Sequence, residues 1–249
     1  MVKGLDTFRN FFVGFENQYV LIGGAACDIL FSGNEGQFRA TRDLDIVLIV
    51  EALTPEFGEK LWEFIKLGQY RNKATGSGKP QFYRFDKPEQ DNYPKMIELF
   101  ARTDCELKEI SGLTPIHVGD DISSLSAILL DDDYYKTLLD GKININGLSV
   151  LRPEYLILFK AKAYMDLRSR KEIGENIDSR DIKKHKNDIL RISAEFLLEP
   201  INMLPEKVYM DISEFAGMLE REPFDASLLQ NYGLENEELV ERLRRLYVV

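Results

Sequence analysis

YVLIGG at residues 19–24 and TRDLDIV at residues 41–47 are the two stretches of sequence that decide the fold. The first is a short apolar, partly β-branched run, which predicts a buried strand that ends at Gly23 and Gly24. A helix is expected to begin at these glycines. Its free backbone N–H groups and its dipole would then favour an anion at this turn.

The second stretch predicts a strand over residues 44–50 with two acidic side chains at its start. Because side chains alternate along a strand, Asp43 and Asp45 share one face, while Leu44 and Ile46 take the other. At a separation of ~5 Å and an effective dielectric of ~20, two carboxylates repel by roughly 3 kcal/mol unless a cation intervenes. Magnesium prefers oxygen ligands and typically combines one or two carboxylates with substrate phosphates. The stretch therefore predicts a magnesium site beside an anion-binding turn, as a bound nucleoside triphosphate requires.

The order of strand, Gly-Gly, helix and Asp-x-Asp resembles the fingerprint of the nucleotidyltransferase superfamily. The spacer over residues 25–42 is longer than in the tightest members and is closer to the branch of AbiEii/AbiGii-type toxins. The resemblance implies an α/β (α+β) fold with a mixed sheet, flanking helices and a C-terminal helical domain. It also implies a Mg²⁺-dependent enzyme that moves a nucleoside monophosphate from a triphosphate to a hydroxyl acceptor and releases pyrophosphate.

A third acidic residue, Glu98, lies in the otherwise apolar stretch MIELF at residues 96–100. A charge in a buried strand is costly unless it is paired or bound to a metal. The resemblance implies a third carboxylate on a later strand, which assists deprotonation of the acceptor. We therefore expect Asp43, Asp45 and Glu98 to be catalytic metal ligands, the alternative for Glu98 being an exposed strand face. Gly23, Gly24 and Thr41 are expected to bind the nucleotide.

Two stretches of the second half, LRPEYLILFKAKA at residues 151–163 and DSRDIKKHKNDI at residues 178–189, resemble the helical half of the AbiEii-type family. That resemblance places a functional lysine at Lys160, with Lys162 as its neighbour, and a functional aspartate at Asp181. Asp188 is the competing match for the aspartate. A lysine within an apolar run either extends its ammonium to the surface or meets an anion. Lys160 and Lys162 are therefore expected to bind the nucleotide, and Lys160 and Asp181 to be catalytic.

Helical periodicity dominates the sequence after Pro153, which predicts two domains with a boundary near residue 150. Residues 1–150 are expected to form the nucleotidyltransferase-like catalytic domain, and residues 151–249 a helical domain that completes the nucleotide and acceptor site. The first domain should hold helices over 8–15 and 55–67, with Thr54 as N-cap, and strands over 81–85, 95–101, 127–130 and 143–150. The second should hold helices over 153–171, 179–198, 205–220 and 235–246.

Composition narrows the classes of partner. With 249 residues and 44% hydrophobic side chains the chain can bury a core. A net charge of −10 argues against nucleic-acid binding over the whole surface, yet residues 160–191 hold ten Lys and Arg against six Asp and Glu, a local net of +4. No apolar run has the length of a membrane span and no signal-peptide core is present, so we expect a cytoplasmic protein without a membrane partner.

The acceptor is the part of the function with the most alternatives. The toxin branch implies RNA, typically tRNA, as acceptor and a cognate antitoxin as partner. The same half-fold also resembles antibiotic-modifying nucleotidyltransferases, whose acceptor is a small aminoglycoside or lincosamide, and an acidic protein would suit a cationic drug. A third alternative is a nucleotide-binding regulatory protein without turnover, although the presence of Asp43, Asp45 and Glu98 counts against it.

Overall fold

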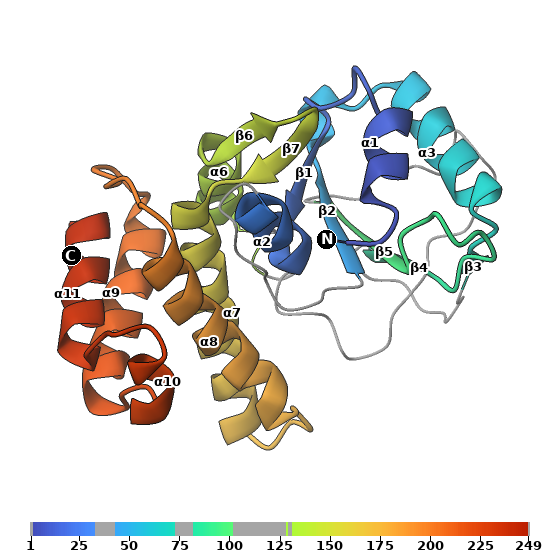
Figure 1. Cartoon of the computed structure of the whole chain (residues 1–249). Coiled ribbons are helices and arrows are strands. Elements are labelled where there is room, and N and C mark those ends of the chain that lie inside the picture. The colour runs from blue at the N-terminus through green and yellow to red at the C-terminus, as the bar shows by residue number, and fades with distance from the viewer. Residues whose placement is uncertain (1, 33–42, 73–81, 102–127, 129–130, 249) are drawn as a thin grey trace. The chain divides into compact units, whose positions relative to one another are not determined.

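The computed structural model describes residues 2–32, 43–72, 82–101, 128 and 131–248, which divide into two compact units (Figure 1). The first unit comprises Met1–Leu130 and Lys142–Leu151, and the second comprises Asp131–Gly141 and Arg152–Val249. The division expected at residue 150 differs from these units in one segment, because residues 131–141 cluster with the helices of the second unit.

The first unit is built on a mixed sheet. Within the described residues this sheet has seven strands in the order β3-β4-β5-β2-β1-β7-β6. The pairs β2–β5 and β1–β7 are parallel, and the other neighbours are antiparallel. The strands are β1 (Tyr19–Ile22), β2 (Asp43–Leu48), β3 (Arg71–Asn72), β4 (Phe82–Asp86), β5 (Met96–Ala101), β6 (Lys142–Ile145) and β7 (Leu148–Leu151). The mixed α/β fold class predicted from the sequence is confirmed.

Helices α1 (Leu5–Phe11) and α3 (Pro55–Leu67) cover one face of this sheet with aromatic side chains. Phe8 packs edge-on against Tyr19 of β1, and Trp62 packs in the same way against Phe85 of β4. Tyr19 pairs with Leu48 of β2 in the ladder, so these two side chains lie on the same face of the sheet. Asp45 is three residues before Leu48, and because side chains alternate along a strand it projects from the other face. The acidic side chains of β2 therefore lie on the face opposite to α1 and α3.

Several predicted bounds of the first unit are confirmed. β1 and α3 have the expected residues, and the Thr54 hydroxyl accepts a hydrogen bond from the Phe57 N–H at 3.3 Å as the N-cap of α3. α1 begins three residues earlier than expected, and a short 3-10 helix occupies Val50–Ala52. Of the strand expected over residues 127–130 only Ile128 is described; it is helical, so the prediction is wrong there.

The segment expected to form strands over residues 143–150 is a hairpin of β6 and β7. Its turn is made by Asn146 and Gly147, whose φ angles are 51° and 80°. Two positive φ angles in a two-residue turn are typical of the type I′ hairpin that an Asn-Gly pair favours. The turn explains why the stretch is divided into two strands.

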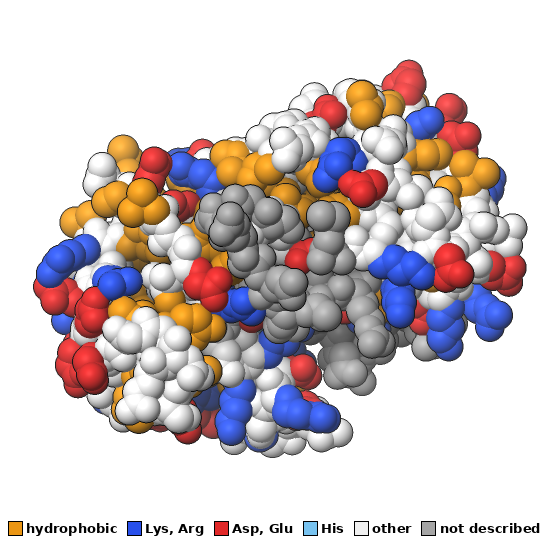
Figure 2. Space-filling model, viewed as in Figure 1, with side chains coloured by type: hydrophobic (Ala, Val, Ile, Leu, Met, Phe, Trp, Pro, Cys, Tyr) orange, Lys and Arg blue, Asp and Glu red, His pale blue; other side chains and the backbone are white. Residues whose placement is uncertain are grey.

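The second unit is helical. The predicted helices are confirmed as α7 (Pro153–Glu172), α8 (Ser179–Glu195), α9 (Glu206–Arg221) and α11 (Asn236–Tyr247), whereas α6 (Asp132–Asp140) and α10 (Ala226–Gln230) were not expected. Acidic and basic side chains are interspersed on the surface of this unit (Figure 2). Within the described part of the chain, no helix combines the length and apolarity needed to cross a membrane.

Candidate active site at the edge of the sheet

The turn after β1 lies against the acidic side chains of β2. In the antiparallel ladder Ile22, the last residue of β1, pairs with Asp45, and Gly23 follows with a φ of +64°. A Cβ atom added to Gly23 would lie 2.1 Å from the Oδ2 atom of Asp45. The carboxylate of Asp45 therefore occupies the space that a side chain at residue 23 would need, and only glycine fits.

Helix α2 (Gly23–Ser32) begins at this turn. The N–H groups of its first turn have no partner inside the helix, and the positive end of the helix dipole lies at the same place. No acidic residue lies in that first turn. Gly23 and Gly24 thus combine a backbone suited to anion binding with direct proximity to a carboxylate.

Asp43 and Asp45 share one face of β2, as the alternation predicted. Both are half-buried, while Leu44 and Ile46 between and beside them are buried on the other face. Two half-buried carboxylates at the end of a strand remain accessible to a ligand. Thr41, expected to join them, lies outside the described residues.

Glu98 lies beside Asp45 in the parallel ladder of β2 and β5. Directly paired residues project from the same face of a sheet, so the two carboxylates are neighbours. Across the next ladder Glu98 pairs with Arg84 of β4, whose Nε donates a hydrogen bond to its Oε1 at 2.7 Å. The side chain of Glu98 is only 14% exposed, and its charge is compensated by this arginine.

Arg84 is the residue of this face that sequence reasoning missed. The signal was an arginine at the centre of FYRF in the strand expected over residues 81–85. A charge in that position needs a partner for the same reason that Glu98 does.

The donor atoms fit a magnesium ion held by two carboxylates. Asp43 and Asp45 supply oxygen ligands, and substrate phosphates and water usually complete such a site. Among the described residues, no three side chains of His, Cys, Asp or Glu converge closely enough to hold a metal together. The expected three-carboxylate set is thus not assembled here, and Glu98 is bound to Arg84 instead.

In the second unit Lys160 is buried on α7 and pairs with Asp188 of α8. The Lys160 Nζ atom lies 2.7 Å from Oδ2 of Asp188, and the two side chains are 6% and 5% exposed. Asp181, the residue favoured by the sequence, lies two turns earlier and is exposed in the first turn of α8. The structure therefore brings Lys160 together with the competing match, Asp188.

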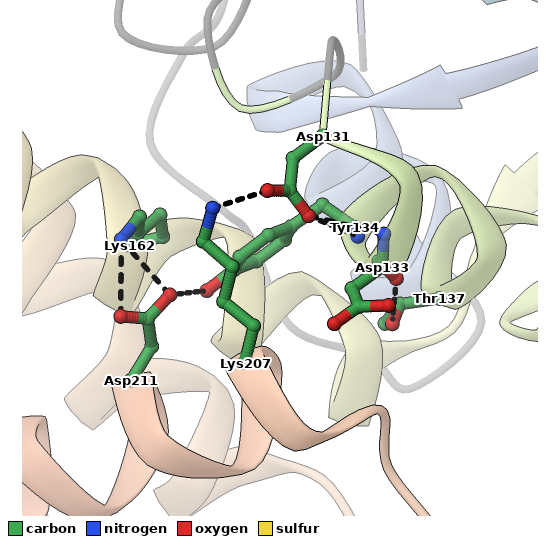
Figure 3. Close-up of polar contacts among 7 residues, drawn as sticks. All are labelled: Asp131, Asp133, Tyr134, Thr137, Lys162, Lys207 and Asp211. Atoms are coloured by element: carbon green, nitrogen blue, oxygen red, sulfur yellow. Dashed lines mark hydrogen bonds and ion pairs between the residues drawn. The ribbon is translucent and has the colours of Figure 1, made fainter.

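Lys162 belongs to a second polar cluster, which joins α6, α7 and α9 (Figure 3). Its Nζ atom contacts both carboxylate oxygens of Asp211, at 3.0 and 2.9 Å, and the Tyr134 hydroxyl donates to the same carboxylate at 2.9 Å. Burial, reinforced by Asp211, raises the pKa of Tyr134 well above its usual value. The side chain of Lys162 is 26% exposed, so it is more accessible than Lys160.

No family model matches the chain, and no curated protein matches its sequence. Among solved structures it is similar to the crystal structure of an antigenic nucleotidyltransferase-like protein from Paracoccidioides brasiliensis. The TM-score is 0.44 and the identity 16%, over 92% of this chain and 85% of that one.

Proposed function

We propose that the chain is a nucleotidyltransferase that moves a nucleoside monophosphate from a magnesium-bound triphosphate to a hydroxyl acceptor. The observation that carries the proposal is the contact between Gly23 and the Asp45 carboxylate, at the start of α2. An anion-binding turn and a pair of carboxylates then meet at one edge of the sheet, as a metal-bound polyphosphate requires.

The chain's own residues would act in three ways. The first-turn N–H groups of α2 at Gly23 and Gly24 would hold the phosphate tail of the triphosphate. Asp43 and Asp45 would hold magnesium, which when bound withdraws charge from the phosphate oxygens and aligns donor and acceptor. Glu98 would accept the proton of the acceptor hydroxyl at Oε2, while Arg84 fixes its carboxylate through Oε1.

For the second unit, the resemblance alone proposes Lys160 and Lys162 as anion-binding residues. Lys162 has the more accessible side chain of the two, at 26% exposed against 6% for Lys160, and it would have to exchange its ion pair with Asp211 for a bound anion. Lys160 and Asp188 would then serve by fixing α7 against α8. A role for Asp181 stays a proposal that follows from the resemblance alone.

The acceptor that we favour is RNA, typically tRNA, in a toxin-like protein with a cognate antitoxin. The main alternatives are a small antibiotic acceptor and a nucleotide-binding protein without turnover. Expression in bacteria separates an RNA acceptor from an antibiotic acceptor, because an RNA-modifying toxin should arrest growth and an antibiotic-modifying enzyme should not.

Transfer of label from a radiolabelled triphosphate to total RNA tests the proposed activity. We expect wild type to transfer label only with magnesium, and Asp43→Asn to lose at least a hundredfold in rate because the metal loses a ligand. Asp6→Asn is the matched control, because Asp6 is an exposed aspartate of α1. Equal transfer by wild type and Asp43→Asn would reject the proposed mechanism.

A further inference from the structure

Three charged side chains lie in one row across the acidic face of the sheet. Asp45 of β2 pairs with Glu98 of β5, and Glu98 pairs with Arg84 of β4. Neighbouring strands lie about 4.8 Å apart, so Glu98 has a carboxylate on one side and a guanidinium on the other at similar spacing. Glu98 can therefore either join Asp45 in binding a metal or pair with Arg84.

In the structure the carboxylate of Glu98 is bound by Arg84. The Nε and Nη2 atoms of Arg84 lie 2.7 and 2.6 Å from Oε1 of Glu98. The side chain of Glu98 is 14% exposed and that of Arg84 is 39% exposed, so the contact is partly shielded from water. Hydrogen bonds between two ionised groups are roughly twice as strong as those between neutral groups. Arg84 therefore competes with a metal ion for Glu98.

A second row of the same face also ends in an arginine. Asp43 pairs with Met96, Met96 pairs with Asp86 of β4, and Asp86 pairs with the exposed Arg71 of β3. Over the strands β2 to β5, the acidic face thus carries four carboxylates and two guanidinium groups, a net charge of −2. One divalent ion neutralises this charge, whereas two ions would reverse it.

A two-metal site places its ions roughly 3.5–4 Å apart, where they hold the attacking and the leaving oxygens of an in-line displacement. Such a site needs carboxylates on both sides of a shared ligand. Asp43 lies two residues before Asp45 on β2, and Glu98 lies beside Asp45 across the ladder. Because Arg84 binds Glu98, a cation of the protein already occupies the place on the β5 side where a second ion would bind.

We propose that Arg84 takes the place of a second metal, so that the chain binds a single divalent ion at Asp43 and Asp45. The inference rests on the proposed function, since it takes the metal to be bound at these two aspartates. Without a second ion beside the acceptor, its hydroxyl needs a base, which is the role proposed for Glu98. Arg84 is then a positioning residue that keeps Glu98 out of the coordination of the ion.

Titration with Mn²⁺ in the absence of nucleotide, followed by electron paramagnetic resonance, counts the bound ions. Two Mn²⁺ ions at the spacing of a two-metal site give an exchange-coupled spectrum, which a single ion does not give. We expect wild type to bind one Mn²⁺ per chain without this coupling. Asp45→Asn should bind that ion at least tenfold more weakly, because the ion loses a ligand.

Arg84→Gln is the informative variant, and Arg71→Gln is its matched control. Both remove one arginine from the same face, but Arg71 pairs with Asp86 in the ladder instead of Glu98. We expect Arg84→Gln to bind two Mn²⁺ ions with the coupled spectrum, because Glu98 is released beside Asp45. Arg71→Gln should still bind one. The double variant Arg84→Gln with Glu98→Gln should return to one ion, because the ligand of the second ion is lost.

Thermal unfolding of each variant is measured beside the count, because Arg84→Gln leaves Glu98 without its partner. Arg84→Lys keeps the positive charge and should bind one Mn²⁺ as wild type does. The count in wild type requires no substitution, and two coupled ions there would overturn the proposal. A single ion in folded Arg84→Gln would overturn it as well.

The result is separable from the proposed enzymatic activity, because the count requires neither nucleotide nor turnover. If wild type bound one ion that depends on Asp45, and folded Arg84→Gln also bound only one, the role of Arg84 would be overturned and the proposed metal site would stand. If neither wild type nor any variant bound Mn²⁺, both would be overturned.

Discussion

At the scale of single residues, Gly23 is the position where backbone, packing and chemistry meet. Its positive φ disfavours any side chain, and the Asp45 carboxylate fills the space where a Cβ would lie. The two constraints are independent, because the first concerns the local backbone and the second concerns a neighbouring strand. They can be separated by comparison with a second glycine.

Gly23→Ala is expected to disturb both the fold and the ligand site. The positive φ alone should lower the free energy of unfolding by roughly 1–2 kcal/mol. Displacement of the Asp45 carboxylate should in addition weaken nucleotide binding at least tenfold. Thermal unfolding and titration with magnesium and a triphosphate measure the two effects.

Gly14→Ala is the matched control for this substitution. Gly14 has a φ of +89°, and no atom lies within 4 Å of an added Cβ. We expect a similar loss of stability from the backbone and no loss of nucleotide affinity. If both variants bound nucleotide as well as wild type, the contact between Gly23 and Asp45 would have no functional role.

At the scale of elements, helices α7 and α8 are joined by a buried ion pair. Lys160 and Asp188 are almost fully buried, so removal of one partner leaves an uncompensated charge in the core. Lys160→Ala should therefore lower the free energy of unfolding by about 3–5 kcal/mol. Chemical denaturation of the purified variant measures this loss.

The double variant Lys160→Met with Asp188→Leu separates stability from function. Replacement of a buried ion pair by apolar side chains of similar volume is often neutral or stabilising, so most of the lost stability should return. If label transfer returned as well, the pair would be structural. A stable double variant without transfer would instead assign Lys160 or Asp188 a direct role.

Helices α6 and α9 are joined by the ion pair of Asp131 and Lys207, which also belongs to the cluster in Figure 3. Burial alone would raise the pKa of Asp131, but Lys207 and the Tyr134 N–H outweigh burial and lower it below 3.8. The hydrogen bond to Asp131 raises the pKa of Lys207 above 10.5. The ion pair should therefore stabilise the fold while Asp131 is ionised and Lys207 is protonated. This stabilisation should be lost as the pH falls through the lowered pKa of Asp131, or rises through the raised pKa of Lys207.

A double-mutant cycle of Asp131→Asn and Lys207→Gln measures this dependence on pH. Asparagine keeps the N-cap of α6, so the cycle isolates the charges. We expect a coupling of about 0.2–1 kcal/mol at neutral pH, as for other partly exposed pairs. The coupling should vanish once Asp131 is protonated, and a coupling that persisted unchanged at a pH where NMR titration shows this carboxyl to be protonated would contradict the assignment.

The elements also show what the sequence could predict. β1 and α3 were predicted with their observed bounds, because an apolar run ending in Gly-Gly and a Thr-Pro cap are strong local signals. α6 was missed although Asp131 is a good N-cap and acidic residues fill its first turn. Local signals therefore fix long or well-capped elements, while a short helix depends on its packing against other helices.

At the scale of the whole molecule, the sequence could not predict which charged side chains contact one another across distant elements. The alternation along β2 placed Asp43 and Asp45 on one face, and the structure agrees. The register that sets Glu98 against Arg84, and the packing that sets Lys160 against Asp188 rather than Asp181, depend on elements far apart in the chain. Charged residues within apolar stretches signal that a partner is needed, but no local signal identifies that partner.

The charge of the whole molecule is consistent with a small number of anion sites. The net charge is −10, so phosphate-bearing ligands should be attracted only where lysines gather. Lys and Arg outnumber Asp and Glu by ten to six over residues 160–191 of the second unit. Binding of RNA should accordingly be weak and strongly dependent on salt.

Calorimetric titration of the four nucleoside triphosphates, with and without magnesium, tests the central claim most directly. We expect at least one triphosphate to bind wild type only with magnesium, and Asp45→Asn to bind it at least tenfold more weakly, while Asp6→Asn behaves as wild type. Binding that was the same with and without the metal, or that was unaffected in Asp45→Asn, would contradict a metal-bound triphosphate at Gly23.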